Sequence, residues 1–284
     1  MSTAEGGRPS PGEGFAGRIS RSPWALNVAL GVLVAGGFFI SLLLGPDGFG
    51  LPSGEDAMRL VLVEIRLPRA LLGILVGGAL GLSGAALQGY LRNPLAEPGL
   101  LGMAGGASLG AVIAIHTGAA GFISLALPLG GLAGAAIVSL AVVLLAGQGS
   151  APVTLILAGV AMSSVAAALT SLVLNLAPNP FASVEMIYWM MGSLNDRSLL
   201  HVWIAAPLIV AGALVLITTR GALNALSLGD AAAANLGVDA RSLRMRIVAG
   251  SALAVGAATS VTGAIGFVGL VVPHLLRPLV AHEP

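Results

Sequence analysis

Residues 92–102 read Arg92-Asn93-Pro94-Leu95-Ala96-Glu97-Pro98-Gly99-Leu100-Leu101-Gly102 and stand between two long, glycine-rich apolar segments. A proline cannot donate a backbone hydrogen bond, and it disfavours helix in the residue before it. Asn93-Pro94 should therefore end one helix, and Pro98-Gly99 should begin the next. At membrane depth, such irregular backbone persists only where protein buries it or water reaches it. The stretch predicts either a functional turn between two membrane helices or an ordinary interfacial loop.

The composition is that of a membrane protein, since 56% of the residues are hydrophobic and 9% are charged, against about 25% charged in soluble domains. All the basic residues are arginine, and the net charge of +1 provides no basic face for nucleic acid. A phosphate-binding loop of the form G-x-x-x-x-G-K-[ST] requires its lysine, so the chain cannot carry that kind of ATP site. The absence of cysteine excludes disulfides and thiolate metal sites.

The apolar segments predict an all-α, polytopic integral membrane protein with about eight spans. The spans are expected near residues 24–44, 70–89, 100–117, 123–146, 153–174, 199–219, 245–260 and 264–280, the last two as short or strongly broken helices. Residues 1–21 are rich in Gly, Pro, Ser and charge, which predicts a disordered tail, and residues 22–284 form the transmembrane domain. The distribution of arginine places the amino terminus in the cytoplasm. A secretory signal is the alternative for the first span, but no clear cleavage pattern follows it.

Two further patterns concern packing and partners. Glycines recur every fourth residue at 73, 77 and 81 and again at 102, 106 and 110, a spacing that lets membrane helices approach closely, either within one chain or at a dimer or pathway face. Between the sixth and seventh spans, residues 220–246 contain an alanine run that Asp230 precedes and Gly237 ends. This pattern predicts a short cytoplasmic helix, which is either a plain loop helix or a docking element for a partner.

Four segments occur in the order of one known family. They are Arg66-Leu67-Pro68-Arg69, then Asn93-Pro94-Leu95-Ala96-Glu97-Pro98-Gly99, then residues 229–237, and finally Gly263-Ala264-Ile265-Gly266-Phe267-Val268-Gly269-Leu270-Val271-Val272-Pro273-His274. Together they resemble the FecCD-type permeases of bacterial importers for iron siderophores, haem and cobalamin, including the vitamin B12 permeases. The resemblance implies ten spanning helices, so this chain is expected to lack the last two.

The resemblance also implies a type II ABC importer in the bacterial cytoplasmic (inner) membrane. Two permease chains, identical or related, would enclose a path for a metal chelate. Two separate ABC ATPase subunits would hydrolyse ATP, and a periplasmic or lipid-anchored binding protein would deliver the ligand. The permease would then be a transport subunit with no cofactor and no catalytic residue of its own.

Three sets of site residues follow from the resemblance. Asn93 and Leu95 look like part of a cytoplasmic gate, together with Pro152 and Val153 in a turn that is less polar than the family's pattern. Arg66 and Arg69 would pair with carboxylates of the binding protein, which suits the bidentate guanidinium. The alternative is pairing with lipid headgroups or within the chain, where Glu64 is close in sequence. The coupling helix that rests on the ATPase would contain Gly229, Asp230, Ala231, Ala232, Asn235, Leu236 and Gly237.

Several other residues invite a role. Glu97 is expected to cap the helix that Pro98-Gly99 begins. His116, His201 and His274 lie on different predicted segments, so no metal site is expected. Residues 188–191, Tyr-Trp-Met-Met, would either contact a large ligand at the outer mouth or anchor the chain in the aromatic belt.

The favoured function is the permease subunit of an importer for an iron siderophore or similar metal chelate, with haem and cobalamin as alternatives. An ion-coupled secondary transporter is the rival from another class. That class usually needs intramembrane carboxylates or broken midplane helices, whereas nearly all charges here fall in predicted loops. An integral membrane enzyme would require a polar catalytic cluster, and the sequence has none with suitable spacing.

Overall fold

The computed structural model describes residues 23–45, 48–50, 54–123, 125–147 and 152–280. The tail expected at residues 1–21 lies outside these ranges. The chain begins with α2 (Pro23–Leu43) and a two-stranded hairpin of β1 (Leu44–Gly45) and β2 (Gly48–Phe49). A continuous helical rod follows, made of α3 (Glu55–Leu60), the π-helical segment η1 (Val61–Arg66) and α4 (Leu67–Leu91).

The remaining elements are helical. The middle of the chain forms the 3-10 helix η2 (Pro98–Leu101), α5 (Met103–His116), α6 (Ala119–Phe122), α7 (Ala126–Ala146) and α8 (Pro152–Asn175). The last part forms α9 (Pro180–Met190), α10 (Leu199–Ile217), α11 (Arg220–Ser227), α12 (Asp230–Asn235), α13 (Ala240–Thr262), α14 (Val268–Leu276) and the 3-10 helix η3 (Arg277–Val280).

The expected all-α, polytopic membrane fold is confirmed. In the described ranges, six helices are long and apolar enough to cross a membrane, and two apolar helices are shorter. The long ones are Trp24–Leu43, Glu55–Leu91, Ala126–Ala146, Pro152–Asn175, Leu199–Ser227 and Ala240–Thr262, and the shorter ones are Met103–His116 and Val268–Val280. The eight expected apolar segments are thus present, although two of them are shorter than a spanning helix.

The expectation for residues 245–260 was wrong. This segment belongs to α13, an unbroken helix of 23 residues. Asp239 caps its amino end, accepting the backbone N–H of Arg241 at 3.0 Å and of Ser242 at 3.2 Å, so the helix begins before the apolar run does. Four hydroxyl side chains in its middle and end, those of Ser251, Thr259, Ser260 and Thr262, are buried in the bundle. By contrast, α14 is short as expected, with nine residues and Pro273 inside it.

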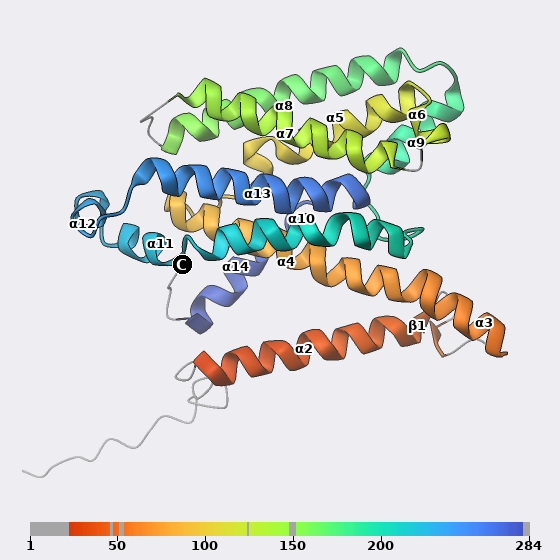
Figure 1. Ribbon diagram of the computed structural model, residues 1–284, viewed down its shortest axis with the longest axis horizontal. Helices are drawn as coiled ribbons and strands as arrows, with labels where there is room; N and C mark the ends of the chain where they lie inside the picture. Colours follow the sequence, from red (N-terminus) through yellow and green to blue (C-terminus); the bar gives the residue numbers. More distant parts are fainter. Residues whose placement is uncertain (1–22, 46–47, 51–53, 124, 148–151, 281–284) are drawn as a thin grey trace, which may run out of the picture.

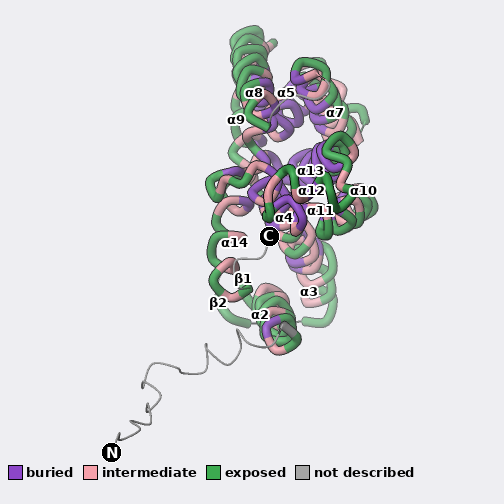
Figure 2. Tube along the Cα trace, turned by 90° about the vertical axis from the view of Figure 1, so that its left-hand side faces the viewer, coloured by how far each residue is buried: buried purple, intermediate pink, exposed green. Residues whose placement is uncertain are grey.

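The helices form layers around α13 (Figure 1). α5, α7 and α8 lie on one side of α13, and α10 and α4 lie on the other, with α14 beyond them. α2 lies apart at the edge, and only 6% of its apolar window is buried by the rest of the chain. Figure 2 shows that the buried residues are concentrated in α4, α5 and α13, at the centre of these layers, whereas α2 is mostly exposed or half-buried.

Glycines set the contact between α5 and α7. A Cβ atom on Gly106 would lie 2.5 Å from the carbonyl oxygen of Gly134, and one on Gly110 would collide with the carbonyl of Gly130. The second glycine series therefore packs within the chain. In the first series, a Cβ on Gly77 would meet nothing within 4 Å, whereas one on Gly81 would lie 3.3 Å from Cγ1 of Val272 in α14.

Because α5 and α7 approach so closely, adding one methyl group between them should lower the stability of the fold. Gly110→Ala should destabilise the fold by about 1–3 kcal/mol, because the helices must move apart. Gly78→Ala is the matched control, since a Cβ there has open space and alanine favours helix over glycine by up to about 1 kcal/mol. Thermal unfolding in a neutral detergent should show a lower midpoint for the first variant alone. Equal midpoints would contradict the packing argument.

Candidate functional site

The turn after α4 is held by its own amide side chain. α4 ends at Leu91 because Arg92 adopts a left-handed conformation with φ of 48°. The Oδ1 atom of Asn93 accepts the N–H of Leu95 at 2.9 Å, and the Asn93 carbonyl accepts the N–H of Ala96 at 3.1 Å. The Asn93 side chain thus stabilises the turn, and Leu95 projects from it with 71% of its surface exposed.

The second half of the 92–102 stretch, which contains η2, is fixed between α8 and α14. Pro98 begins η2, and Gly102 ends it in a left-handed conformation with φ of 73°. A Cβ atom on Gly159 of α8 would collide with the Leu100 carbonyl, and one on Gly269 of α14 would lie 2.7 Å from Cδ of Pro98. Glu97 occupies the position before η2, but its side chain makes no capping hydrogen bond. The expected cap is therefore wrong, because η2 is held by packing instead.

The segment expected to contact an ATPase forms a compact unit at one end of the bundle. Gly229 with φ of 108° and Gly237 with φ of 81° bracket α12. Ala233 is buried and fixes α12 to the bundle, whereas Ala231, Asn235 and Leu236 are exposed. Leu228 and Leu236 expose 70% and 64% of their surfaces. Exposed apolar side chains of this kind are typical of a contact with another protein or with the membrane.

An ion pair joins this unit to the turn. Arg92 Nη2 donates a hydrogen bond to Asp230 Oδ1, across 138 positions of sequence. Both side chains are partly or largely exposed, so the pair is worth at most about 1 kcal/mol. Its importance is geometric, because it connects the residue next to Asn93 with the first residue of α12.

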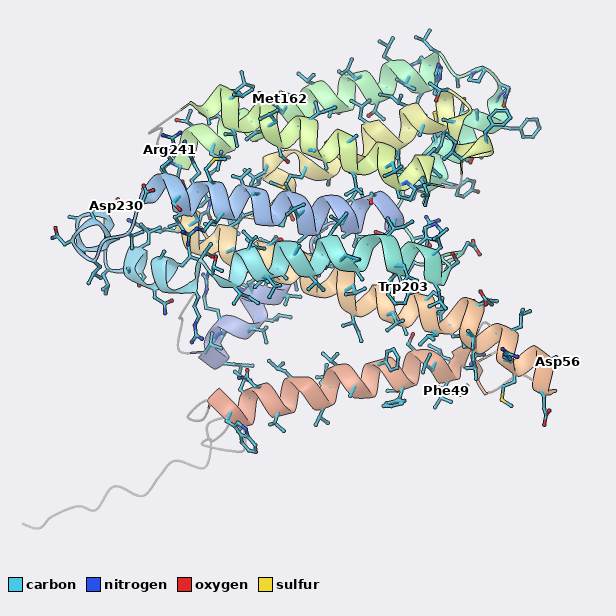
Figure 3. The ribbon with its side chains drawn as sticks, in the orientation of Figure 1. Phe49, Asp56, Met162, Trp203, Asp230 and Arg241 are labelled. Atoms are coloured by element: carbon cyan, nitrogen blue, oxygen red, sulfur yellow. The ribbon has the colours of Figure 1, made fainter. Side chains whose placement is uncertain are left out.

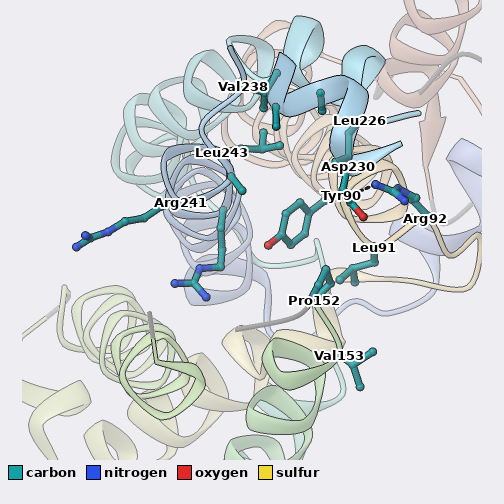
Figure 4. A pocket seen from close by; sticks show the side chains of 14 residues that line it. Tyr90, Leu91, Arg92, Pro152, Val153, Leu226, Asp230, Val238, Arg241 and Leu243 are labelled. Carbon is teal, nitrogen blue, oxygen red and sulfur yellow. Dashed lines mark hydrogen bonds and ion pairs between the residues drawn. The ribbon is translucent and has the colours of Figure 1, made fainter. Parts of the chain in front are cut away.

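A cavity of about 560 Å³ lies beside this ion pair (Figure 4). Its lining residues are Tyr90, Leu91, Arg92, Pro152, Val153, Leu226, Asp230, Ala233, Ala234, Val238, Ala240, Arg241, Leu243 and Arg244. Three segments predicted from sequence to act together therefore meet here: the turn after α4, the start of α8 and α12. We call this space the arginine-lined cavity. Sequence reasoning missed the contributions of Tyr90, Arg241 and Arg244.

Arg66 and Arg69 lie at the opposite end of the bundle, near the β1–β2 hairpin (Figure 1). Figure 3 shows the separation, with Phe49 and Asp56 at one end and Asp230 and Arg241 at the other. Arg66 Nη1 donates to the carbonyls of Leu42 and Gly50, both at 2.8 Å, and Arg66 is only 6% exposed.

Arg69 makes weaker contacts with the same end of α2. Its Nη2 donates to the carbonyl of Leu44 at 3.1 Å and to that of Ser41 at 3.4 Å. The last carbonyls of a helix have no partner within the helix, so the two arginines satisfy acceptors that α2 leaves open. Sequence reasoning missed this role. Their docking to a binding protein stays a prediction, in which the partly exposed Arg69 is the more accessible partner.

The other residues that the sequence suggested for a functional role do not come together in one site. Trp189 packs in the cluster formed by Val112, Ile115 and Met186, whereas Tyr188 and Met191 are 70% and 71% exposed. His201 Nδ1 accepts the Ser198 N–H at 3.2 Å, at the start of α10. Over the described part of the chain, no three His, Cys, Asp or Glu side chains come together as a metal site would require.

Comparison with known proteins assigns the chain to a family. A sequence model described as the FecCD transport family matches residues 25–284. The chain belongs to the FecCD transport family. It is 41% identical over 239 residues to the ferric enterobactin transport system permease protein FepD of Escherichia coli strain K12, covering 81% of this chain and 69% of FepD.

Two further comparisons agree with FecCD membership. The vitamin B12 import system permease protein BtuC of Salmonella typhimurium strain LT2 is 37% identical over 256 residues, covering 89% of this chain and 77% of BtuC. A solved structure assigned to the metal-chelate type of ABC transporter, in an inward-facing conformation, superimposes with a TM-score of 0.82 at 30% identity. The match covers 90% of this chain and 82% of that one. These relatives are transport permeases, which confirms the expected class of transport subunit.

The contacts of Arg66 predict a specific defect in its variants. Arg66→Ala removes two hydrogen bonds from a charged donor, each worth about 1.5–3 kcal/mol. Amide hydrogen exchange at residues 41–45 and 48–50 should therefore become at least about tenfold faster. Arg59→Ala, an exposed arginine on α3, is the control and should leave this exchange unchanged. Equal exchange in both variants would contradict the assigned contacts.

Proposed function

We propose that the chain is the membrane-spanning permease subunit of an ATP-driven ABC importer that carries an iron siderophore or similar metal chelate across the bacterial cytoplasmic membrane. Its proposed partners are a second permease chain, as a homodimer or with a related permease, two ABC ATPase subunits and a periplasmic or lipid-anchored binding protein. The kinship with FepD and with the metal-chelate type of transporter supports this class of ligand. Cobalamin is the second candidate because BtuC is a relative of similar identity.

The observation that carries the proposal is the direct link between Arg92 and Asp230. In the proposed mechanism, closure of the ATPases moves α12, which the exposed Leu228 and Leu236 attach to the ATPase surface. The ion pair passes this movement to the turn at residues 92–96 as a rigid-body shift. Leu95, exposed on that turn, then enters or leaves the path and gates it by packing and dewetting.

The other predicted site residues take their places in the same scheme. Pro152 and Val153 line the same cavity as Asp230 and Ala233 of α12, which supports a second gate segment there. Gly229 and Gly237 set the ends of α12, and Asp230, Ala231, Ala232, Asn235 and Leu236 form the surface offered to the ATPase. Arg66 and Arg69 are proposed to face the binding protein at the other end, with the amino terminus in the cytoplasm.

Uptake by proteoliposomes tests the proposed function. The full chain is purified with its co-expressed permease partner, ATPase and binding protein, and is offered radioiron-labelled ferric enterobactin or labelled cobalamin. We expect ATP-dependent uptake of the iron chelate that ionophores do not abolish. Uptake that proceeds without the ATPase and collapses with the ion gradient would instead identify a secondary transporter.

Charge exchange tests the role of the ion pair. Arg92→Asp and Asp230→Arg should each reduce uptake about fivefold or more while ATP hydrolysis continues, because like charges repel where a pair of about 1 kcal/mol stood. The double exchange should recover most of the uptake. Arg220→Asp is the control, as Arg220 is exposed and lies outside the cavity lining. A double variant no better than the single ones would remove the ion pair from the mechanism.

A further inference from the structure

Two serines at the centre of the bundle lack the hydrogen bonds that other buried hydroxyl groups of the chain make. Ser83 of α4 and Ser251 of α13 are both 0% exposed, and neither hydroxyl oxygen has a partner among the described residues. By contrast, Ser139, Thr170 and Thr262 donate to the carbonyl four residues earlier in their own helices, at 2.7, 2.8 and 2.9 Å. A hydroxyl that is removed from water without a partner destabilises a fold. The two serines therefore need an explanation beyond packing.

The geometry of α4 and α13 brings the two serines together. The helices run in opposite directions, because Tyr90 at the end of α4 and Arg244 near the start of α13 line the same cavity and interact electrostatically. Seven residues make about two helical turns and so return to the same face of a helix. Ser83 lies seven residues before Tyr90, and Ser251 lies seven residues after Arg244. Both serines therefore lie at one level, on the faces that the two helices turn toward each other.

The same register continues on both sides of the serines. Seven residues farther along each helix, Val76 and Ala258 are buried in one apolar cluster. On the other side, Leu87 and Ile247 are buried in a second apolar cluster. A serine hydroxyl both donates and accepts hydrogen bonds. Between two apolar clusters, each of the two hydroxyls is therefore the natural partner of the other.

The contact between α4 and α13 lies where the proposed coupling movement would arrive. Only residues 236–239 separate α12 from α13, so a shift of α12 acts on α13. Helix α10 is expected to move with α13, because a Cβ on Gly250 would lie 2.8 Å from Cγ of Leu216. Helix α4 is held by other contacts, since a Cβ on Gly84 would collide with the Gly269 carbonyl of α14. A movement of α12 would therefore slide α13 along α4, as packed helices do in shear motions.

We propose that Ser83 and Ser251 are positioning residues that hydrogen-bond to each other in the conformation produced by closure of the ATPases. One hydroxyl donates and the other accepts, once α13 has shifted along α4. In the present conformation the bond is open, and the two unpaired hydroxyls raise the free energy of this state relative to the closed one. The inference rests on the proposed function, because it uses the movement of α12 that the ATPases would drive.

Alanine variants test the pair. Ser83→Ala and Ser251→Ala each remove an unpaired hydroxyl from the present conformation, so each should raise the thermal unfolding midpoint of the full chain in neutral detergent by about 2 °C. Each should also slow ATP-driven uptake by the proteoliposomes about fivefold, because the bond of the second conformation is lost. The double variant should be no slower than the single ones, since all three lack the same bond.

Ser139→Ala is the matched control. Ser139 is buried and already bonded within α7, so its loss should lower the midpoint and leave uptake unchanged. Lower midpoints for Ser83→Ala and Ser251→Ala would show that their hydroxyls are already paired, for example through an ordered water, and would overturn the proposal. Raised midpoints with normal uptake would overturn it as well. A wild-type chain without ATP-driven uptake would instead contradict the proposed function.

Cysteine cross-linking measures the approach of the two helices directly. The chain contains no cysteine, so Ser83→Cys combined with Ser251→Cys introduces its only thiols. A disulfide forms when the two Cα atoms lie about 4.4–6.8 Å apart. With the ATPase bound and ATP trapped, oxidation should form this disulfide faster than it does without nucleotide. Equal rates would overturn the proposal. Because the cross-link is read without transport, it separates a failure of this inference from a failure of uptake.

Discussion

Backbone groups at helix ends need hydrogen-bond partners from side chains, other backbone or water, and within the hydrocarbon only the protein offers them. Much of this structure follows from that constraint. Asn93 satisfies the turn after α4 and Asp239 satisfies the start of α13. Arg66 satisfies the end of α2, and the buried Gln88 donates to the Leu270 carbonyl at 3.4 Å. Asn93, Asp239 and Arg66 act where a helix ends, whereas Gln88 joins the interior of α4 to α14.

Gln88 shows how one such contact positions a second element. Its Oε1 atom accepts from Arg277 Nη2 at 3.2 Å, so a single amide connects α4 with the first turn of α14 and with the first residue of η3. The close approach of Gly84 and Gly269 brings the same helices together. Since Gly269 also lies against Pro98, α14 packs directly against the turn at residues 92–102. The turn is therefore restrained at α8 and α14, while Leu95 at its tip stays exposed.

The sequence predicts local breaks well and distant contacts poorly, for physical reasons. The end of α4 follows from Pro94, but α5 begins only at Met103 because Pro98–Leu101 first forms a 3-10 turn. Helix α9 was missed although Asn179 and Pro180 are a usual helix start, and Asn179 indeed accepts the Ala182 N–H at 2.9 Å. The Arg92–Asp230 pair spans 138 positions, and no local pattern reveals it. Carbonyl acceptors such as those of Leu42 and Gly50 have no side-chain signature at all.

The two ends of the bundle use arginine in different ways. At the arginine-lined cavity, Asp230 cancels the charge of Arg92 while it holds the turn. At the hairpin end, carbonyl oxygens accept hydrogen bonds from Arg66 and Arg69, and a neutral acceptor satisfies the guanidinium fork without cancelling its charge. A structural role at the end of α2 and attraction of an acidic partner are therefore compatible, because the first uses the directional hydrogen bonds and the second uses the remaining charge. On this argument Arg69, the more exposed of the two, would offer its guanidinium to the binding protein from a position already fixed by α2.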